Sequence, residues 1–123
     1  MNSYKQTIGR LGEEVAMRYL QDKGHDVVKT NYKNRYGEID IITQDGEYTV
    51  FVEVKTRTSI NYGNPSEAVN FYKKKHMKKC AQYYLYPDKY ETAMRFDIVE
   101  IIGYMSGGDL KITNINHIEN AIC

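Results

Sequence analysis

Three acidic residues and a lysine interrupt a stretch that otherwise reads as two apolar strands, GEIDIITQDGEYTVFVEVKTR at residues 37–57. Side chains alternate between the two faces of a β-strand. Glu38 and Asp40 therefore share one face of the first strand, and Glu53 and Lys55 share one face of the second. Carboxylates held side by side repel one another unless a cation lies between them. The pattern predicts a site for a divalent cation, with a lysine beside it.

The two strands are predicted to form a hairpin, because Asp45-Gly46 between them is a strong turn signal. A two-residue loop there would set Asp40 opposite Phe51 and would make Asp40 and Glu53 diagonal neighbours, with backbones roughly 7–8 Å apart. Any loop with an even number of residues keeps Asp40, Glu53 and Lys55 on one face. This charged row is expected to face the first helix, while the opposite, apolar face makes the core. The residues expected on the apolar face are Ile39, Ile41, Val52 and Val54.

The atoms expected to bind the cation are all oxygens, which favours magnesium or manganese and argues against zinc. Lys55, two residues beyond Glu53, would point at the same place, where an ammonium group could orient a water and stabilise charge on a phosphate. The plainer alternative is a solvated hairpin face. In that case Lys55 would neutralise Glu38 or Glu53 in exposed ion pairs that contribute little.

A helix is predicted over residues 7–23, ending at Gly24, because apolar and small side chains recur there every three or four positions. Glu14 shares its side of this helix with two arginines in an exposed ladder of opposite charges. Glu13 lies at the edge of the packed side, next to small residues that permit close approach to the sheet. If one of these two glutamates reaches the acidic residues of the hairpin, we expect it to be Glu13; otherwise Glu13 is a rim residue.

A second helix is predicted to begin near Asn64-Pro65-Ser66-Glu67, a helix-start signal, and to end near Leu85. Lys73 falls on its otherwise apolar side and could reach the acidic residues or a bound phosphate, although a lysine whose stem lies along apolar surface is the common explanation. Lys74 and Lys75 belong to its basic outer surface. Lysines of this kind contact phosphates without reading sequence.

The whole chain, residues 1–123, is expected to fold as a single domain. It contains no apolar run long enough for a membrane helix and no secretory signal, so we expect a cytoplasmic protein without a membrane partner. Its two cysteines form neither a metal-like spacing nor a disulfide framework. The three histidines are isolated in the sequence, and we find no pattern of a zinc site, a serine triad, a phosphate-binding loop or a dinucleotide site.

The expected order of elements is helix, three strands, helix, strand, which packs most simply as a mixed central sheet flanked by helices, an α/β or α+β fold. The strands are predicted at residues 25–33, 39–43, 48–56 and 95–102, with a short edge strand at 110–115.

Four segments together resemble the YraN family of uncharacterised bacterial proteins: GRLGEEVA at 9–16, GEIDII at 37–42, VFVEVKTR at 50–57 and RFDIV at 95–99. That family is similar in turn to the PD-(D/E)XK nuclease superfamily, particularly archaeal Holliday junction resolvases. The resemblance implies an α/β restriction-endonuclease-like core and a metal-dependent endonuclease. Its substrate would be DNA, branched or otherwise structured, in repair or recombination.

The resemblance also implies roles for particular residues. Asp40 and Glu53 would bind Mg²⁺ or Mn²⁺ with the Val54 carbonyl, Lys55 would assist the attacking water, and Glu13 would support the metal site. The residues expected to contact nucleic acid are Arg57, Lys73, Lys74 and Lys75. Two features depart from the superfamily: Ile39 stands where its name has proline, and lysines stand where resolvases carry a glutamine on the second helix.

By analogy with resolvases, a homodimer is expected if two strands are cut in register. The alternative function is a nucleic-acid-binding accessory protein that keeps the nuclease fold but cleaves little or nothing.

Overall fold

The protein has a mixed α/β architecture built on one sheet. The structure, a computed structural model, describes residues 3–58, 71–86 and 93–121. Within these residues the elements are α1 (Tyr4–Asp22), β1 (Asp26–Asn34), β2 (Gly37–Asp45), β3 (Tyr48–Arg57), α2 (Phe71–Leu85), β4 (Met94–Ser106) and β5 (Asp109–Ile118). The five strands lie in sequence order; β3 and β4 are parallel and the other neighbouring pairs are antiparallel. The expected order of helix, three strands, helix and strand is therefore confirmed.

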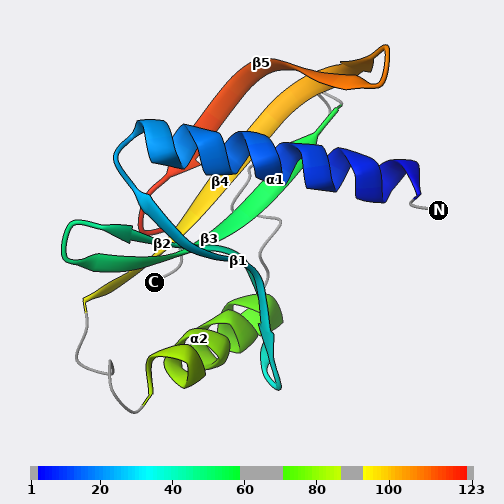
Figure 1. The fold of residues 1–123 in the computed structure, drawn as a ribbon. Coiled ribbons are helices and arrows are strands. Elements are labelled where there is room, and N and C mark those ends of the chain that lie inside the picture. The colour runs from blue at the N-terminus through cyan, green and yellow to red at the C-terminus, as the bar shows by residue number, and fades with distance from the viewer. Residues whose placement is uncertain (1–2, 59–70, 87–92, 122–123) are drawn as a thin grey trace.

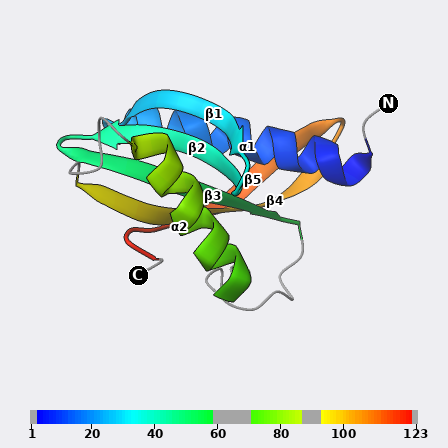
Figure 2. The same ribbon diagram turned by 90° about the horizontal axis from the view of Figure 1, so that it is seen from below.

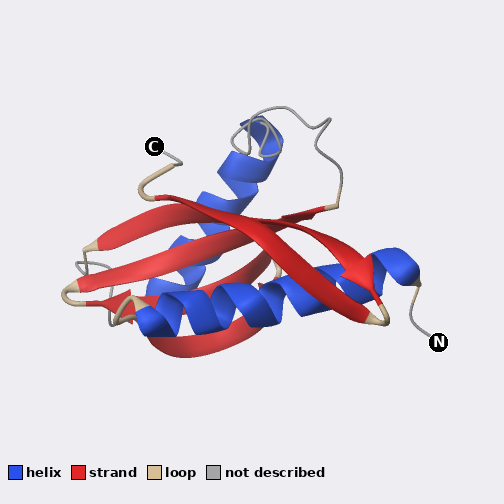
Figure 3. Ribbon diagram, turned by 90° about the horizontal axis from the view of Figure 1, so that it is seen from above, coloured by secondary structure: helices blue, strands red, loops and turns tan. Residues whose placement is uncertain are grey.

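The two helices cover opposite faces of the sheet (Figures 1 and 2). Figure 3 shows α1 on the near side of the strands and α2 behind them. On the α1 face Ala16 and Leu20 pack on valines and isoleucines of β2, β3 and β4. On the α2 face Met77 and Cys80 pack on Phe51 and other buried residues of the sheet. Burial of these two apolar layers holds the helices in place.

The first helix begins earlier than the periodicity predicts. Ser3 caps it by accepting a hydrogen bond from the Gln6 N–H at 3.1 Å, and the Gln6 side chain accepts one from the Ser3 N–H at 3.0 Å. This reciprocal pair satisfies two of the donors left open at a helix start. The helix ends as predicted before Gly24, whose φ of 96° suits glycine.

The β2–β3 hairpin has a different register from the predicted one. Asp45 pairs with Tyr48, so the loop is Gly46-Glu47 rather than Asp45-Gly46. Gly46 has a φ of 58°, the positive value that the first position of a two-residue loop can require. The shift preserves which residues share a face, but it moves Asp40 from opposite Phe51 to the level of Glu53. The two carboxylates therefore face one another across the strands instead of diagonally.

The expected alternation of β2 also fails at Asp40. Ile41 packs on the α1 face, where the charged row was expected, whereas Ile39 packs on the α2 face with Met77. On the neighbouring β1, Asn31 has a φ of 50°, a left-handed conformation that asparagine tolerates. The two strands turn over together at this point, so the prediction that Ile39 and Ile41 share a face is wrong.

The second half of the chain extends the sheet. The edge strand predicted at residues 110–115 is present as the longer β5, which pairs with β4 from Ile98 to Ser106. The predicted start of the second helix at residues 64–67 lies outside the described residues. None of the described helices is long and apolar enough to cross a membrane.

Candidate functional site

A cavity of about 300 Å³ lies at the end of β3, between α1 and the strands. Its walls include four of the side chains singled out in the sequence: Glu13 from α1, Asp40 from β2, and Glu53 and Lys55 from β3. Val54 also lines it. The fold thus brings together residues that are up to 42 positions apart in the chain.

Glu53 is nearly buried, with 5% of its surface exposed. It shares the sheet face of Phe51, which α2 covers, and its carboxylate forms an ion pair with Lys73 of α2. The prediction that the charged row faces the first helix is therefore wrong for Glu53, which points toward the second helix, α2. Lys73, on the packed side of its helix, does reach an acidic residue of the site.

Asp40 lies across from Glu53 and accepts a hydrogen bond from the Val54 N–H at 2.8 Å. Burial raises the pKa of Asp40, the negative charge of Glu53 raises it further, and together they bring it to about 8. The Val54 N–H opposes this rise, while Glu13 adds to it. A carboxyl group of this kind is easily ionised only when a cation is close by.

Glu13 approaches the same cavity from α1. Its Oε1 is buried and has no hydrogen-bond partner among the described residues. Burial raises the pKa of Glu13, and the carboxylates of Glu38 and Glu53 raise it further. The approach depends on Gly12, because a Cβ built there would lie 1.8 Å from Oγ1 of Thr56 on β3. A buried carboxylate oxygen without a donor is costly unless a ligand or water satisfies it.

The two neighbouring acidic residues, Glu14 and Glu38, lie outside the cavity and pair with exposed basic side chains. Glu14 is exposed and forms an ion pair with Arg10 at 3.2 Å, as the helix pattern predicts. Glu38 is exposed and lies 3.7 Å from Lys33. Neither residue lines the cavity with Asp40 and Glu53.

Lys55 is half-buried and lines the cavity. Within the part of the chain that the structure describes, its ammonium group makes no ion pair with a carboxylate. The plainer alternative, in which Lys55 neutralises Glu38 or Glu53, is therefore absent from this arrangement: Lys33 and Lys73 take those places. Lys55 remains available to a group that enters the cavity.

The donors around the cavity fit a hard divalent cation with an incomplete protein shell. Among the described ranges, no three His, Cys, Asp or Glu side chains are grouped so that they could hold a metal ion by themselves. Magnesium needs no such group, since it retains several waters and commonly takes one or two carboxylates. Asp40 and Glu53 could provide these two, and the unsatisfied oxygen of Glu13 could accept a hydrogen bond from a water in the cavity.

Arg57 is not placed for the contact with nucleic acid that was expected of it. It is buried, and its Nε lies 2.7 Å from Oε2 of Glu100 on β4. Oε1 of Glu100 accepts a hydrogen bond from the Asn116 side chain of β5 at 2.9 Å. Arg57 thus ties three strands together, and leaving its buried partner unpaired would cost several kcal/mol, on the order of 3–5. Its placement argues against the predicted role.

The lysines of α2 divide by exposure. Lys75 and Lys79 are exposed, whereas Lys73, Lys74 and Lys78 are half-buried. The expected basic outer surface is therefore present on α2, and Lys75 belongs to it. Lys73 instead forms the ion pair with Glu53.

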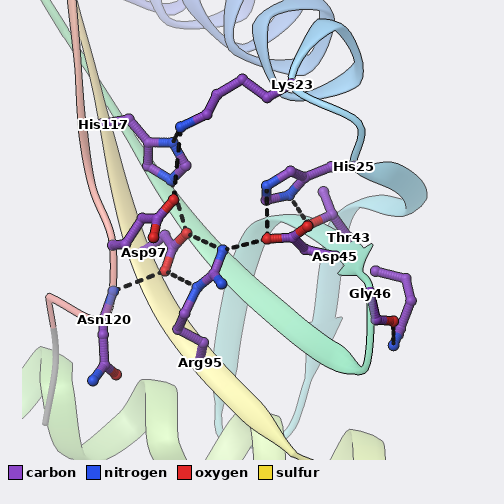
Figure 4. Close-up of polar contacts among 11 residues, drawn as sticks. Lys23, His25, Thr43, Asp45, Gly46, Arg95, Asp97, His117 and Asn120 are labelled. Carbon is purple, nitrogen blue, oxygen red and sulfur yellow. Dashed lines mark hydrogen bonds and ion pairs between the residues drawn. The ribbon is translucent and has the colours of Figure 1, made fainter.

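A second polar cluster, which the sequence did not reveal, lies near the starts of β3 and β4 (Figure 4). Asp97, fully buried, receives hydrogen bonds from Arg95 and the Asn120 N–H, and it lies 2.7 Å from Nε2 of His117. Burial alone would raise the pKa of Asp97, but the hydrogen bonds from His117, Arg95 and Asn120 outweigh it and hold the pKa below its usual value.

The same cluster continues to the end of α1. Lys23 lies 2.9 Å from Nδ1 of His117, and Arg95 also contacts Asp45 at 3.1 Å. His25 is held by Thr43 at 2.8 Å, and burial lowers its pKa. Two of the three histidines that look isolated in the sequence, His25 and His117, thus join the helix end to β2, β4 and β5. Their partners are already inside the fold, which gives this cluster a structural role.

Comparison with known proteins agrees with the sequence motifs. The model of the uncharacterised protein family UPF0102 matches residues 12–101, which include Glu13, Asp40, Glu53 and Lys55. The chain belongs to the UPF0102 family. This is the family indicated above as YraN, so that expectation is confirmed.

Relatives in the UPF0102 family match nearly end to end. A UPF0102 protein of Caldanaerobacter subterraneus is 44% identical over 118 residues, 95% of each chain. One of Caldicellulosiruptor bescii is 46% identical over 118 residues, 93% of this chain and 95% of its own. One of Thermodesulfovibrio yellowstonii is 41% identical over 114 residues, 93% of this chain and 94% of its own.

Proposed function

We propose that this UPF0102 protein is a magnesium- or manganese-dependent endonuclease that hydrolyses phosphodiester bonds of DNA. One observation carries the proposal: a single cavity collects Glu13, Asp40, Glu53 and Lys55, with a raised pKa at Asp40 and an unsatisfied buried oxygen at Glu13. Confined carboxylates of this kind favour a bound cation, and perturbed titratable groups in a cavity are typical of active sites. The order of elements also agrees with a restriction-endonuclease-like core.

Each residue has a defined task in this proposal. Asp40 and Glu53 would hold the ion, together with the Val54 carbonyl, and Glu13 would orient water at the cavity wall. Magnesium bound there would polarise the scissile phosphate and lower the pKa of a water. The Lys55 ammonium directs the attacking water and stabilises the charge that develops on the phosphate. With an ion bound at Glu53, the Lys73 ammonium would exchange that carboxylate for a DNA phosphate, beside Lys74 and Lys75.

One observation favours the alternative, a nucleic-acid-binding accessory protein with little or no cleavage. The Lys73 ammonium already neutralises Glu53, so the carboxylate has a cation of its own. A protein that kept this pair permanently would retain the basic surface of α2 without a working metal site.

A cleavage assay distinguishes these functions. Labelled four-way junction, flap, duplex and single-stranded DNA are incubated with the protein in Mg²⁺, Mn²⁺ or chelator. We expect metal-dependent cleavage, reduced at least about 100-fold by Glu53→Gln or by Lys55→Met. Glu47→Gln in the exposed hairpin loop and Lys33→Met in β1 are the matched controls and should cleave normally.

Three outcomes separate the possibilities. Cleavage that survives both Glu53→Gln and Lys55→Met contradicts the assigned site. Salt-sensitive binding without cleavage of any substrate supports the accessory protein. Sedimentation with and without a four-way junction tests the expected homodimer, because a strict monomer in both conditions argues against paired cutting of a junction.

A further inference from the structure

The outward side of α2 combines exposed aromatic rings with lysines. The residues of this outer stripe recur every three or four positions and are all exposed: Tyr72, Lys75, His76, Lys79, Tyr83 and Tyr86. Tyr83 is 53% exposed and Tyr86 is 74% exposed. Figure 2 shows α2 crossing its face of the sheet. The helix places the stripe along about 20 Å, at 1.5 Å per residue.

A hollow next to the stripe is lined by one more tyrosine, which comes from outside the helix. Tyr36, which follows β1, forms it with Lys79, Gln82 and Tyr83, and it has a volume of about 280 Å³. The rings of Tyr36 and Tyr83 lie 5.9 Å apart and are tilted by 60°. The Arg35 guanidinium lies over Tyr36 at 5.3 Å. Two aromatic rings and the Lys79 side chain therefore line one small open space, and the Arg35 guanidinium lies against one of these rings.

The charge of α2 is strongly one-sided. Residues 71–85 carry five lysines and no acidic residue, while the net charge of the whole chain is only +1. The rest of the chain is therefore net negative, and the positive potential is concentrated on this helix. A second copy of α2 would be repelled from the stripe by its own five lysines, so self-association through this surface is unfavourable.

We propose that the outer stripe and its hollow bind an unpaired strand of nucleic acid. Lysines at helical spacing would contact successive phosphates, and bases would stack on Tyr83, Tyr36 and Tyr86. Combined stacking platforms and positive charge are the usual means of binding single strands. A duplex would use the lysines alone because its bases already stack on one another. An acidic peptide would likewise contact the lysines without stacking on the tyrosine rings.

This inference deepens the proposed function by naming the substrate element, an unpaired stretch at a flap, gap or junction, and its link to cleavage rests on that function. The stripe lies on the helix whose Lys73 forms an ion pair with Glu53 of the cavity. A strand that lay along the stripe as far as Tyr72 would therefore come close to that carboxylate.

Tryptophan fluorescence offers a direct test because the chain contains no tryptophan. Tyr83→Trp introduces a single reporter in the stripe, and Tyr104→Trp introduces one on β4 at an equally exposed position, 55%. Binding of a dT₂₀ oligonucleotide in chelator should quench the reporter at position 83 by stacking and leave the one at position 104 nearly unchanged. A blunt duplex of equal length should quench neither strongly.

Affinity measurements separate stacking from charge. In fluorescence anisotropy with labelled dT₂₀, Tyr83→Ala should weaken binding at least about fivefold, while Tyr83→Phe and Tyr104→Ala should stay within about twofold. Lys79→Gln should reduce the slope of log K against log salt by about 0.7, the value for one phosphate of a single strand, whereas Tyr83→Ala should not change it.

Several results would overturn the inference. These are unchanged dT₂₀ affinity in Tyr83→Ala, an equal loss in Tyr104→Ala, or an equal dependence of duplex binding on Tyr83. Competition by a polyglutamate peptide that is as strong as competition by dT₂₀ would indicate a merely cationic surface. Since binding is measured in chelator, loss of stacking with normal cleavage rejects only the stripe, and stacking without cleavage rejects only the nuclease.

Discussion

Replacing Asp40 with asparagine should stabilise the metal-free protein at neutral pH. With a pKa of about 8 in the folded protein and about 3.9 in the unfolded chain, the folded state binds more protons than the unfolded state between these values. The free energy of unfolding therefore falls as the pH rises through this window, by at most about 1.4 kcal/mol per pH unit. Asparagine carries no proton to lose, and its side-chain oxygen can still accept the Val54 N–H.

With this shift, the free energy of unfolding of the wild-type protein should fall by about 4 kcal/mol between pH 4 and pH 7. We therefore expect Asp40→Asn to gain about 2–4 kcal/mol at pH 7 and almost nothing at pH 4. Urea denaturation followed by circular dichroism in chelator measures this difference. Asp26→Asn, at the exposed start of β1, is the matched control and should change stability little at either pH.

Magnesium extends the experiment to the proposed ion. At pH 8 and about 100 times its dissociation constant, Mg²⁺ should raise the unfolding free energy of the wild-type protein by about 2.7 kcal/mol and that of Asp40→Asn much less. Destabilisation by Asp40→Asn at pH 7, or an equal gain at pH 4 and pH 7, would refute the reasoning. Either result would mean that the Asp40 carboxyl is ionised in the folded protein without strain.

Three further substitutions test other parts of the structure. Lys73→Met should destabilise the metal-free protein by about 1–3 kcal/mol, because it leaves a buried carboxylate unpaired, and should tighten Mg²⁺ binding in calorimetry; unchanged Mg²⁺ affinity would contradict competition between the lysine and the ion. Gly12→Ala should lower stability and remove cleavage, because its Cβ meets Thr56. Gly9→Ala is the control: its Cβ meets nothing within 4 Å, so thermal melts should show a gain of about 0.5–1 kcal/mol. Equal melting temperatures of the two variants would show that α1 can shift. Asp97→Asn should cost about 3–5 kcal/mol at pH 7. Since the folded pKa is lowered, this loss should shrink as the pH falls below about 4, and a pH-independent loss would contradict the ionised state.

Much of the architecture could be predicted because it depends on local patterns. Three-and-four spacing predicts α1, the glycine after it predicts its end, and alternation in β3 predicts that Glu53 and Lys55 share a face. An even-numbered hairpin loop preserves that relation whichever two residues form the turn. This is why the collection of the cavity residues follows from the sequence even though the predicted register is wrong by one pair of residues.

The sequence by itself thus determines the order of the elements, the two-sided sheet and the residues available for a metal site. The tertiary structure alone decides which cation neutralises which carboxylate, because these contacts join residues far apart in the chain. Lys73 rather than Lys55 pairs with Glu53, and Arg57 forms an ion pair with Glu100. Lys23 contacts His117, which lies 94 positions later in the chain. Strand periodicity reports only the face on which a side chain lies; the neighbour it meets there depends on packing between distant segments.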